Sequence, residues 1–145
     1  MLGVPEGGCL KAVVVDVDGT LALHSGRDPY DWRSAGADVP NEPVVMVLRA
    51  LAAAGLAIVY ISGRPERARN LTERWLADHV GFHGELHLRA DLDGRRDAVV
   101  KREIYETHIR LRYEVVVVLD DRDQVVRMWR DELGLTCLQV TDGNF

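Results

Sequence analysis

The chain has 145 residues, of which 47% are hydrophobic and 28% are charged, a balance typical of a globular domain rather than of a disordered or membrane chain. Its formal net charge of −5 argues against a protein that coats nucleic acid by charge alone, since phosphate affinity comes mainly from lysine and arginine. An enzyme that acts on a nucleic-acid end stays open. From the length we predict a single folded domain over residues 1–145.

Targeting signals are not evident in the sequence. No apolar run reaches the roughly 18 residues that a membrane-spanning helix needs, and the opening MLGVPEGG lacks the regions of a secretory signal. Cys9 and Cys137 lie far apart, without the spacing of a metal site, and suit a compartment that keeps thiols reduced. We therefore expect a cytoplasmic protein without membrane contact, in which both cysteines are packing residues.

The first half of the chain predicts two strands, a polar loop and a helix. The β-branched run LKAVVVDV (10–17) predicts a buried strand, and residues 21–40, rich in Gly, Asp and Pro, predict a long loop or small flap. Asn41 is expected to cap a helix that ends at Gly55. The apolar run LAIVYI (56–61) then predicts a second strand.

The second half continues the alternation, beginning with a helix that Pro65 opens. Further strands are expected at 85–90, 114–119 and 135–140, and further helices at about 97–110 and 122–133. Strands that alternate with helices imply a mostly parallel sheet with helices on both faces. The predicted fold class is thus α/β, with residues 21–40 as its only cap or flap.

Polar groups follow three of the predicted strands. Asp16 and Asp18 follow the first, Ser62-Gly63-Arg64 the second, and Asp120 and Asp121 the fourth. In such sheets, ligands bind outside the carboxyl ends of the strands. Four carboxylates at one edge would repel one another unless a hard divalent cation lies among them, and oxygen ligands without sulfur or imidazole indicate Mg²⁺.

Lysine is rare in this chain, because only Lys11 and Lys101 among its 18 basic residues are lysine. Lys101 lies near the start of the third predicted helix, where a compact ammonium group suits a phosphate contact. Together, DVDGT (16–20), Ser62, Lys101 and the acidic pair 120–121 resemble the four ordered motifs of the haloacid dehalogenase (HAD) superfamily of phosphatases. The resemblance implies a Rossmann-like HAD fold and phosphoryl transfer.

The resemblance also implies roles for these residues. Asp16 would attack phosphorus to give an aspartyl phosphate. Asp18 would act as general acid and then base, with a pKa pushed upward. Ser62 and Lys101 would hold the phosphoryl oxygens. The Mg²⁺ ligands would be Asp16, Asp18, Asp120 and Asp121.

A narrower resemblance covers the chain from about residue 11 to its end. HSGRDPYDW (24–32), ISGR (61–64), RDAVVKREI (96–104), DDRDQVVRMWR (120–130) and CLQVTDGNF (137–145) are similar to the 3′-phosphatase domain of bacteriophage polynucleotide kinase/phosphatase. The resemblance implies Mg²⁺-dependent removal of 3′-phosphates from DNA or RNA ends, and a kinase domain or partner outside this chain. The substrate-binding residues that it implies are Arg27, Gly63, Arg64 and Asp97.

Other interpretations stay open at this point. Ser62-Gly63 would also suit a strand-to-helix corner, Asp97 a helix cap, and Asp121 with Gln124 a capping box. Tyr30 and Trp32 would suit stacking on a terminal base, with core packing as the alternative for Trp32. The substrate is alternatively a small nucleotide or a sugar phosphate. Two alternatives are not hydrolases: a non-catalytic module that binds nucleic-acid ends, and a phospho-accepting switch. The sequence does not choose between DNA and RNA, or between polymer and mononucleotide, and leaves the oligomeric state open.

Overall fold

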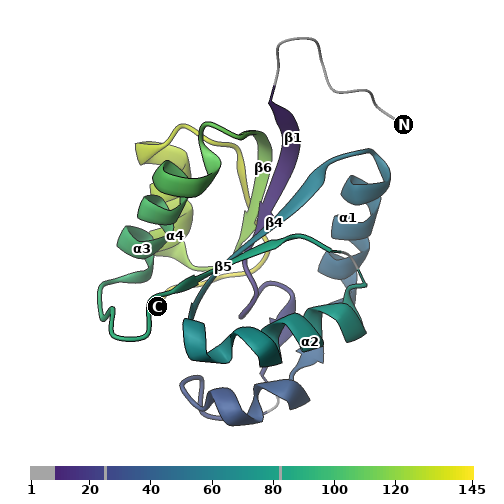
Figure 1. Ribbon diagram of the computed structural model, residues 1–145, viewed down its shortest axis with the longest axis vertical. Helices are drawn as coiled ribbons and strands as arrows, with labels where there is room; N and C mark the ends of the chain where they lie inside the picture. Colours follow the sequence, from purple (N-terminus) through teal and green to yellow (C-terminus); the bar gives the residue numbers. More distant parts are fainter. Residues whose placement is uncertain (1–8, 25, 82) are drawn as a thin grey trace.

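A five-stranded sheet forms the centre of the computed structural model, which describes residues 9–24, 26–81 and 83–145. The strands stand in the order β5-β4-β1-β6-β7, and every neighbouring pair is parallel. The strands are β1 (Leu10–Val15), β4 (Ala57–Pro65), β5 (Glu85–Arg89), β6 (Tyr113–Asp120) and β7 (Cys137–Gln139). The parallel α/β fold predicted from the sequence is confirmed (Figure 1).

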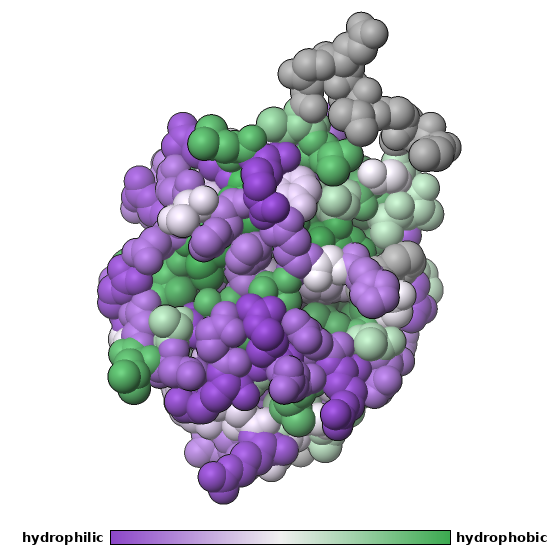
Figure 2. Space-filling model, viewed as in Figure 1, coloured by the Kyte–Doolittle hydropathy of each residue, from purple (hydrophilic) through white to green (hydrophobic). Residues whose placement is uncertain are grey.

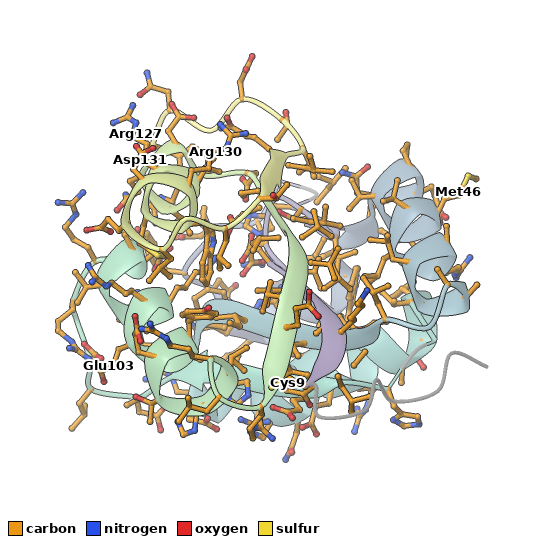
Figure 3. All side chains as sticks on the ribbon, turned by 90° about the horizontal axis from the view of Figure 1, so that it is seen from above. Cys9, Met46, Glu103, Arg127, Arg130 and Asp131 are labelled. Atoms are coloured by element: carbon orange, nitrogen blue, oxygen red, sulfur yellow. The ribbon has the colours of Figure 1, made fainter. Side chains whose placement is uncertain are left out.

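Helices cover both faces of the sheet. One face carries α1 (Glu42–Ala53) and α2 (Arg69–His79), and the other carries α3 (Asp97–Ile104) and α4 (Asp123–Arg127). A short 3₁₀ turn, Glu66–Ala68, precedes α2, and π-helical turns at Tyr105–Ile109 and Met128–Glu132 extend α3 and α4. Figure 3 shows the two layers from above, with Met46 of α1 on one side and Glu103 of α3 and Arg127 of α4 on the other.

The alternation of side chains along β1 builds both cores. Val13 and Val15 pack with α1 and α2, whereas Ala12 and Val14 pack with α3 and α4. A central parallel strand is buried on both faces, so its sequence is an unbroken apolar run rather than an alternation of apolar and polar residues. This is why the run before Asp16 contains no polar residue between Lys11 and that carboxylate.

The flap, residues 21–40, folds over the carboxyl ends of the central strands. Its ends pair as a small antiparallel ladder of β2 (Ala22–Leu23) and β3 (Val39–Pro40), and the 3₁₀ helix Trp32–Ala37 lies between them. The Trp75 Nε1–H of α2 donates to the backbone carbonyl of Asp38 (2.9 Å), which fastens the flap to the helical layer. Figure 1 shows the flap at the lower end of the molecule.

Local differences from the sequence predictions have physical causes. Asn41 occupies the cap position of α1 but makes no side-chain cap bond, because its Nδ2 donates instead to the Thr20 carbonyl (3.0 Å). The strand β4 runs on to Pro65, so the next helix begins after that residue. The prediction that both cysteines pack inside is wrong for Cys9, which is exposed at the start of β1, while Cys137 is buried.

Among the described residues, no helix combines the length and the apolar character that crossing a membrane requires.

Substitution of Leu48 on α1 tests the packing of the core that supports the sheet. The Leu48 side chain is inaccessible to solvent, so Leu48→Ala should lower the free energy of unfolding by about 2–5 kcal/mol, measured by urea denaturation. Met46 lies on the same helix and is 71% exposed, so Met46→Ala is the matched control and should change stability by less than about 0.5 kcal/mol. Equal effects of the two substitutions would contradict the packing described here.

Candidate active site

The polar residues predicted from the sequence gather where β1, β4 and β6 end. Asp16 directly follows β1, and its backbone N–H donates to the Leu119 carbonyl (3.0 Å), which extends the pairing past the strand. Asp120 is the last residue of β6, and Ser62 lies inside β4. Parallel strands bring their carboxyl ends to one edge of the sheet, so these side chains meet there. Figure 2 shows hydrophilic side chains gathered over this lower part of the molecule.

Lys101 reaches this edge from α3. Its neighbours Val100 and Ile104 pack in the core, which turns the lysine side chain toward the strand ends. The Nζ group donates to Asp16 Oδ1 (2.8 Å) and to Asp120 Oδ2 (3.0 Å), and the residue is 2% exposed. Burial lowers the pKa of Lys101, but the charges of Asp120 and Asp16 outweigh burial and raise the pKa, so the ammonium group is retained.

Three carboxyl groups share this buried position. Asp16, Asp120 and Asp121 each offer one carboxylate oxygen, and these oxygens all lie within 4.8 Å of one another. Burial raises the pKa of Asp16 well above its ordinary value; Lys101 opposes this, and Asp120 and Asp121 add to it. Burial also raises the pKa of Asp121. Oxygen ligands with excess negative charge suit a hard divalent cation such as Mg²⁺.

Two neighbours that sequence reasoning missed hold the carboxyl cluster in place. The Thr20 hydroxyl lies 3.2 Å from both Asp16 Oδ2 and Asp121 Oδ1, and Trp129 Nε1–H donates to Asp120 Oδ2 (3.2 Å). Gly19 has a φ of +81°, and a Cβ at this position would lie 2.2 Å from Asp121 Oδ2. Gly19 and Thr20 are the last two residues of the DVDGT motif, so the motif could have indicated that both lie at the site.

Asp18 belongs to a different cluster from Asp16. Arg64 donates to both of its oxygens, with Nε 2.9 Å from Oδ2 and Nη2 2.7 Å from Oδ1, and His24 Nε2 lies 2.9 Å from Oδ1. Burial raises the pKa of Asp18, but the hydrogen bonds from Arg64 and His24 outweigh it and lower the pKa. The predicted upward shift is therefore wrong for this arrangement, because the hydrogen bonds from Arg64 and His24 favour the carboxylate form of Asp18.

Asp38 of the flap is the buried partner of both site arginines, and sequence reasoning missed it. Its side chain is inaccessible; Oδ1 accepts from Arg27 Nε (2.6 Å), and Oδ2 accepts from Nη2 of Arg27 (2.9 Å) and of Arg64 (3.1 Å). Trp32 lies beside both guanidinium groups, each 5.6 Å from its ring centroid. Asp38 is one of several aspartates in the polar segment 21–40, and nothing in the sequence distinguishes it from the others.

The guanidinium nitrogens of Arg27 donate hydrogen bonds to other groups of the protein. Its Nη1 donates to the backbone carbonyls of Asp28 (3.1 Å), Pro29 (3.2 Å) and Asp31 (3.3 Å), while its other nitrogens face Asp38 and Asp18. Its side chain is 6% exposed. The hydrogen bonds to Asp38 raise its pKa against the effect of burial. In this structure Arg27 therefore organises the flap.

Ser62 and Gly63 lie in β4, after its apolar part. The Ser62 hydroxyl is buried and accepts from the Arg64 backbone N–H (3.1 Å), at the point where the pairing of β4 with β5 shifts register between Ile61 and Pro65. Gly63 leaves room for Asp97, since a Cβ at Gly63 would lie 2.6 Å from Asp97 Oδ1. The strand continues through Ser62 and Gly63 to Pro65, so the interpretation of these two residues as a strand-to-helix corner is wrong, and Asp97 lies against the strand at Gly63.

Asp97 lies between Arg89 and Arg122 rather than in the carboxyl cluster. Arg89 bonds Asp97 Oδ1 and donates to the Gly63 carbonyl (3.0 Å), and Arg122 Nη1 donates to Asp97 Oδ2 (2.5 Å). Burial raises the pKa of Asp97, but Lys101 and the two arginines outweigh it and lower the pKa. The helix-cap interpretation of Asp97 is wrong, because the cap of α3 is Arg96.

The structure thus brings the predicted residues to one edge of the sheet but divides them. Asp16, Lys101, Asp120 and Asp121 form one cluster, and the Asp18 side chain faces arginines instead, which separates it from the other predicted metal ligands. The capping-box interpretation of Asp121 is also wrong. The cap of α4 is Arg122, and Gln124 Nε2 lies 3.4 Å from the Phe145 carbonyl.

Two longer proteins resemble this chain in sequence. A protein of Autographa californica nuclear polyhedrosis virus, named as a candidate bifunctional polynucleotide kinase/RNA ligase, is 35% identical over 124 residues, 83% of this chain. A chain in the structure of the Pnkp1/Rnl/Hen1 complex is 44% identical and superposes with a TM-score of 0.91 over 94% of this chain. The present chain spans 18% of the viral protein and 48% of the chain in the complex.

The fold is shared more widely. The class C acid phosphatase of Bacillus anthracis with tungstate bound superposes with a TM-score of 0.66 at 16% identity, over 93% of this chain and 68% of that chain. Comparison with protein families matches residues 10–145 to the polynucleotide kinase PNKP phosphatase domain. The chain therefore belongs to the polynucleotide kinase PNKP phosphatase domain family, and its fold is that of HAD-type phosphatases.

Proposed function

We propose that this chain is a polynucleotide 3′-phosphatase, which hydrolyses the phosphate monoester at the 3′ end of DNA or RNA through an aspartyl phosphate. The observation that carries the proposal is the contact of Lys101 with both Asp16 and Asp120 where β1 and β6 end. Membership of the phosphatase-domain family supports the nucleic-acid substrate.

Asp16 is the proposed nucleophile. Its Oδ1 contacts Lys101 Nζ and its Oδ2 contacts the Thr20 hydroxyl, so the carboxylate is held in one orientation. An oxygen of Asp16 attacks phosphorus, the bond from phosphorus to the 3′ oxygen breaks, and that oxygen takes a proton from Asp18. Water then attacks the aspartyl phosphate, Asp18 accepts its proton, and inorganic phosphate leaves with Asp16 restored.

Asp18 must hold a proton to serve as the acid, although Arg64 and His24 favour its carboxylate form. A phosphate group is a competing anion for the planar donors of Arg64. As Arg64 turns to the substrate, Asp18 loses its main counter-charge and its pKa rises. Binding of the phosphate therefore converts Asp18 from an ion-paired carboxylate into the acid that the reaction needs.

The chemistry of the donor set supports Mg²⁺ as cofactor. Asp16, Asp120 and Asp121 would hold the ion through carboxylate oxygens, which are the ligands that Mg²⁺ prefers. When bound, the ion would neutralise charge on the phosphoryl oxygens. Lys101 already supplies one positive charge at the same position, and we propose that the Ser62 hydroxyl holds a phosphoryl oxygen.

The relatives suggest that the phosphatase works beside other end-modifying activities. The viral relative is named for kinase and ligase activities, and the structural relative belongs to a complex. We propose that a 5′-kinase resides in a longer protein that contains this chain, or in a partner.

Asp16→Asn tests the nucleophile. Wild-type protein with Mg²⁺ should release phosphate faster from a 3′-phosphorylated oligonucleotide than from a 3′-mononucleotide or an aryl phosphate. The variant should lose at least about 1000-fold in kcat, because an amide does not form the aspartyl phosphate. Thermal unfolding checks that the variant is folded. Wild-type preference for the mononucleotide would overturn the polymer substrate, and inactivity on all three would overturn the enzyme.

Asp121→Asn tests the metal site through stability. Folding raises the pKa of Asp121, so its charge costs stability at neutral pH and costs nothing below the ordinary pKa. In chelator at pH 7 the variant should melt at a higher temperature than wild type, and the gain should vanish near pH 3. Added Mg²⁺ should raise the melting temperature of wild type more than that of the variant. A melting temperature below wild type in chelator at pH 7 would contradict the proposed site.

Asp38→Asn tests the arrangement of the two flap-side arginines. Loss of one charged partner should leave Arg27 and Arg64 misplaced and lower kcat/KM for the oligonucleotide by about 10- to 100-fold. Asp78, exposed on α2, is the matched control, and Asp78→Asn should leave kcat/KM unchanged. If both variants keep wild-type kinetics, Asp38 does not position the arginines.

A further inference from the structure

Aromatic side chains lie on two sides of the candidate active site. Tyr30 in the flap is 80% exposed, and Phe145, the last residue of the sequence, is 64% exposed. Trp32, by contrast, is only partly exposed, and the guanidinium groups of Arg27 and Arg64 each lie 5.6 Å from its ring centroid. The two exposed rings are thus the candidates for contact with a nucleobase.

Phe145 is held by the guanidinium group of Arg122, the residue after Asp121. The Arg122 guanidinium lies 5.0 Å from the Phe145 ring centroid, and its Nε donates to the Phe145 carbonyl (2.8 Å). The same residue therefore fixes both the backbone and the ring of Phe145. A ring supported on one side by a guanidinium and exposed over most of its surface offers a flat apolar face.

The segment that carries Phe145 is fastened to residues 121–123, called the acidic loop below. The Gly143 carbonyl accepts from the Asp123 N–H (2.8 Å), and a Cβ at Gly143 would lie 1.9 Å from the Asp121 carbonyl oxygen. Gln139 Nε2 donates to the same Asp121 carbonyl (2.9 Å). Figure 1 shows the C-terminus beside the loop that leads into α3.

Arg122 contacts both Phe145 and the residues beside the candidate active site. It directly follows Asp121, and its Nη1 donates to Asp97, which lies against Gly63. Toward the residues that the structure describes, Arg122 Nη2 donates no hydrogen bond. A nucleotide whose phosphate lies at Asp16 would thus have a fixed ring and an available guanidinium donor on this side.

We propose that Phe145, supported by Arg122, is the stacking platform for the base of the 3′-terminal nucleotide. The inference rests on the proposed function and sharpens it, because it makes a nucleobase part of the recognised substrate. Every base has a π face, so such a platform accepts ends of any sequence. Tyr30 has no cation contact of this kind among the described residues, which is why we assign the base to Phe145.

The test compares two 3′-phosphorylated oligonucleotides that differ only in whether the terminal nucleotide carries its base. For each protein, the base preference is kcat/KM on the ordinary end divided by kcat/KM on the abasic end. Wild type should prefer the ordinary end by about 5- to 100-fold. Phe145→Ala should bring the ratio close to one, and Phe145→Trp should keep it. Leu111 is 87% exposed and precedes the amino end of β6, the strand whose opposite end carries Asp120, so Leu111→Ala is the control and should keep the wild-type ratio.

Each other outcome has a definite meaning. If Phe145→Ala lowers kcat/KM on both ends equally, the residue only supports the acidic loop and the platform is overturned. If Tyr30→Ala removes the preference instead, the base lies on the flap. If wild type acts on ordinary and abasic ends equally, the platform fails while the 3′-phosphatase stands. If wild type releases phosphate from an aryl phosphate but from neither oligonucleotide, the proposed function itself fails.

Discussion

Three carboxyl groups are buried together where β1 and β6 end, and one ammonium group, that of Lys101, lies among them. Like charges in a poorly solvated position repel strongly, so such a cluster persists only if the surrounding structure imposes it. The two apolar cores do this, since they fix the strand ends and turn α3 so that Lys101 points at the acids. In the proposed function, the same excess of negative charge would hold a divalent cation, which would in turn favour a phosphate.

A two-residue separation along the chain gives Asp16 and Asp18 opposite electrostatic environments. Asp16 enters the carboxyl cluster, where burial raises its pKa, whereas Asp18 meets Arg64 and His24, which lower its pKa. In the proposed reaction the first must attack and the second must donate a proton. The pairing of Asp18 with Arg64 links the proton to the substrate, because the phosphate that needs the acid also competes for the arginine.

The flap and the last residues of the chain enclose this edge from two sides with different chemistry. On the flap side, Asp38 collects Arg27 and Arg64 into a buried network that leaves little of either arginine exposed. On the other side, Arg122 supports an exposed aromatic ring. In the proposed function, phosphate binding would rearrange the ion pairs near the flap, whereas a base would meet a surface that is already formed. Recognition of a polymer end would combine the two.

The sequence by itself determined the order of strands and helices along the chain, because β-branched runs and Gly stops are local signals. It also located Asp16, Ser62, Lys101 and the acidic pair at one edge, since parallel strands end together. Only the tertiary structure decided which charges meet. Asp38 carried no local signal, and the orientation of Asp18 toward Arg64 joins residues 46 positions apart. Ion pairs of this kind depend on distances between side chains from different elements. The pattern of residues along the chain does not give these distances.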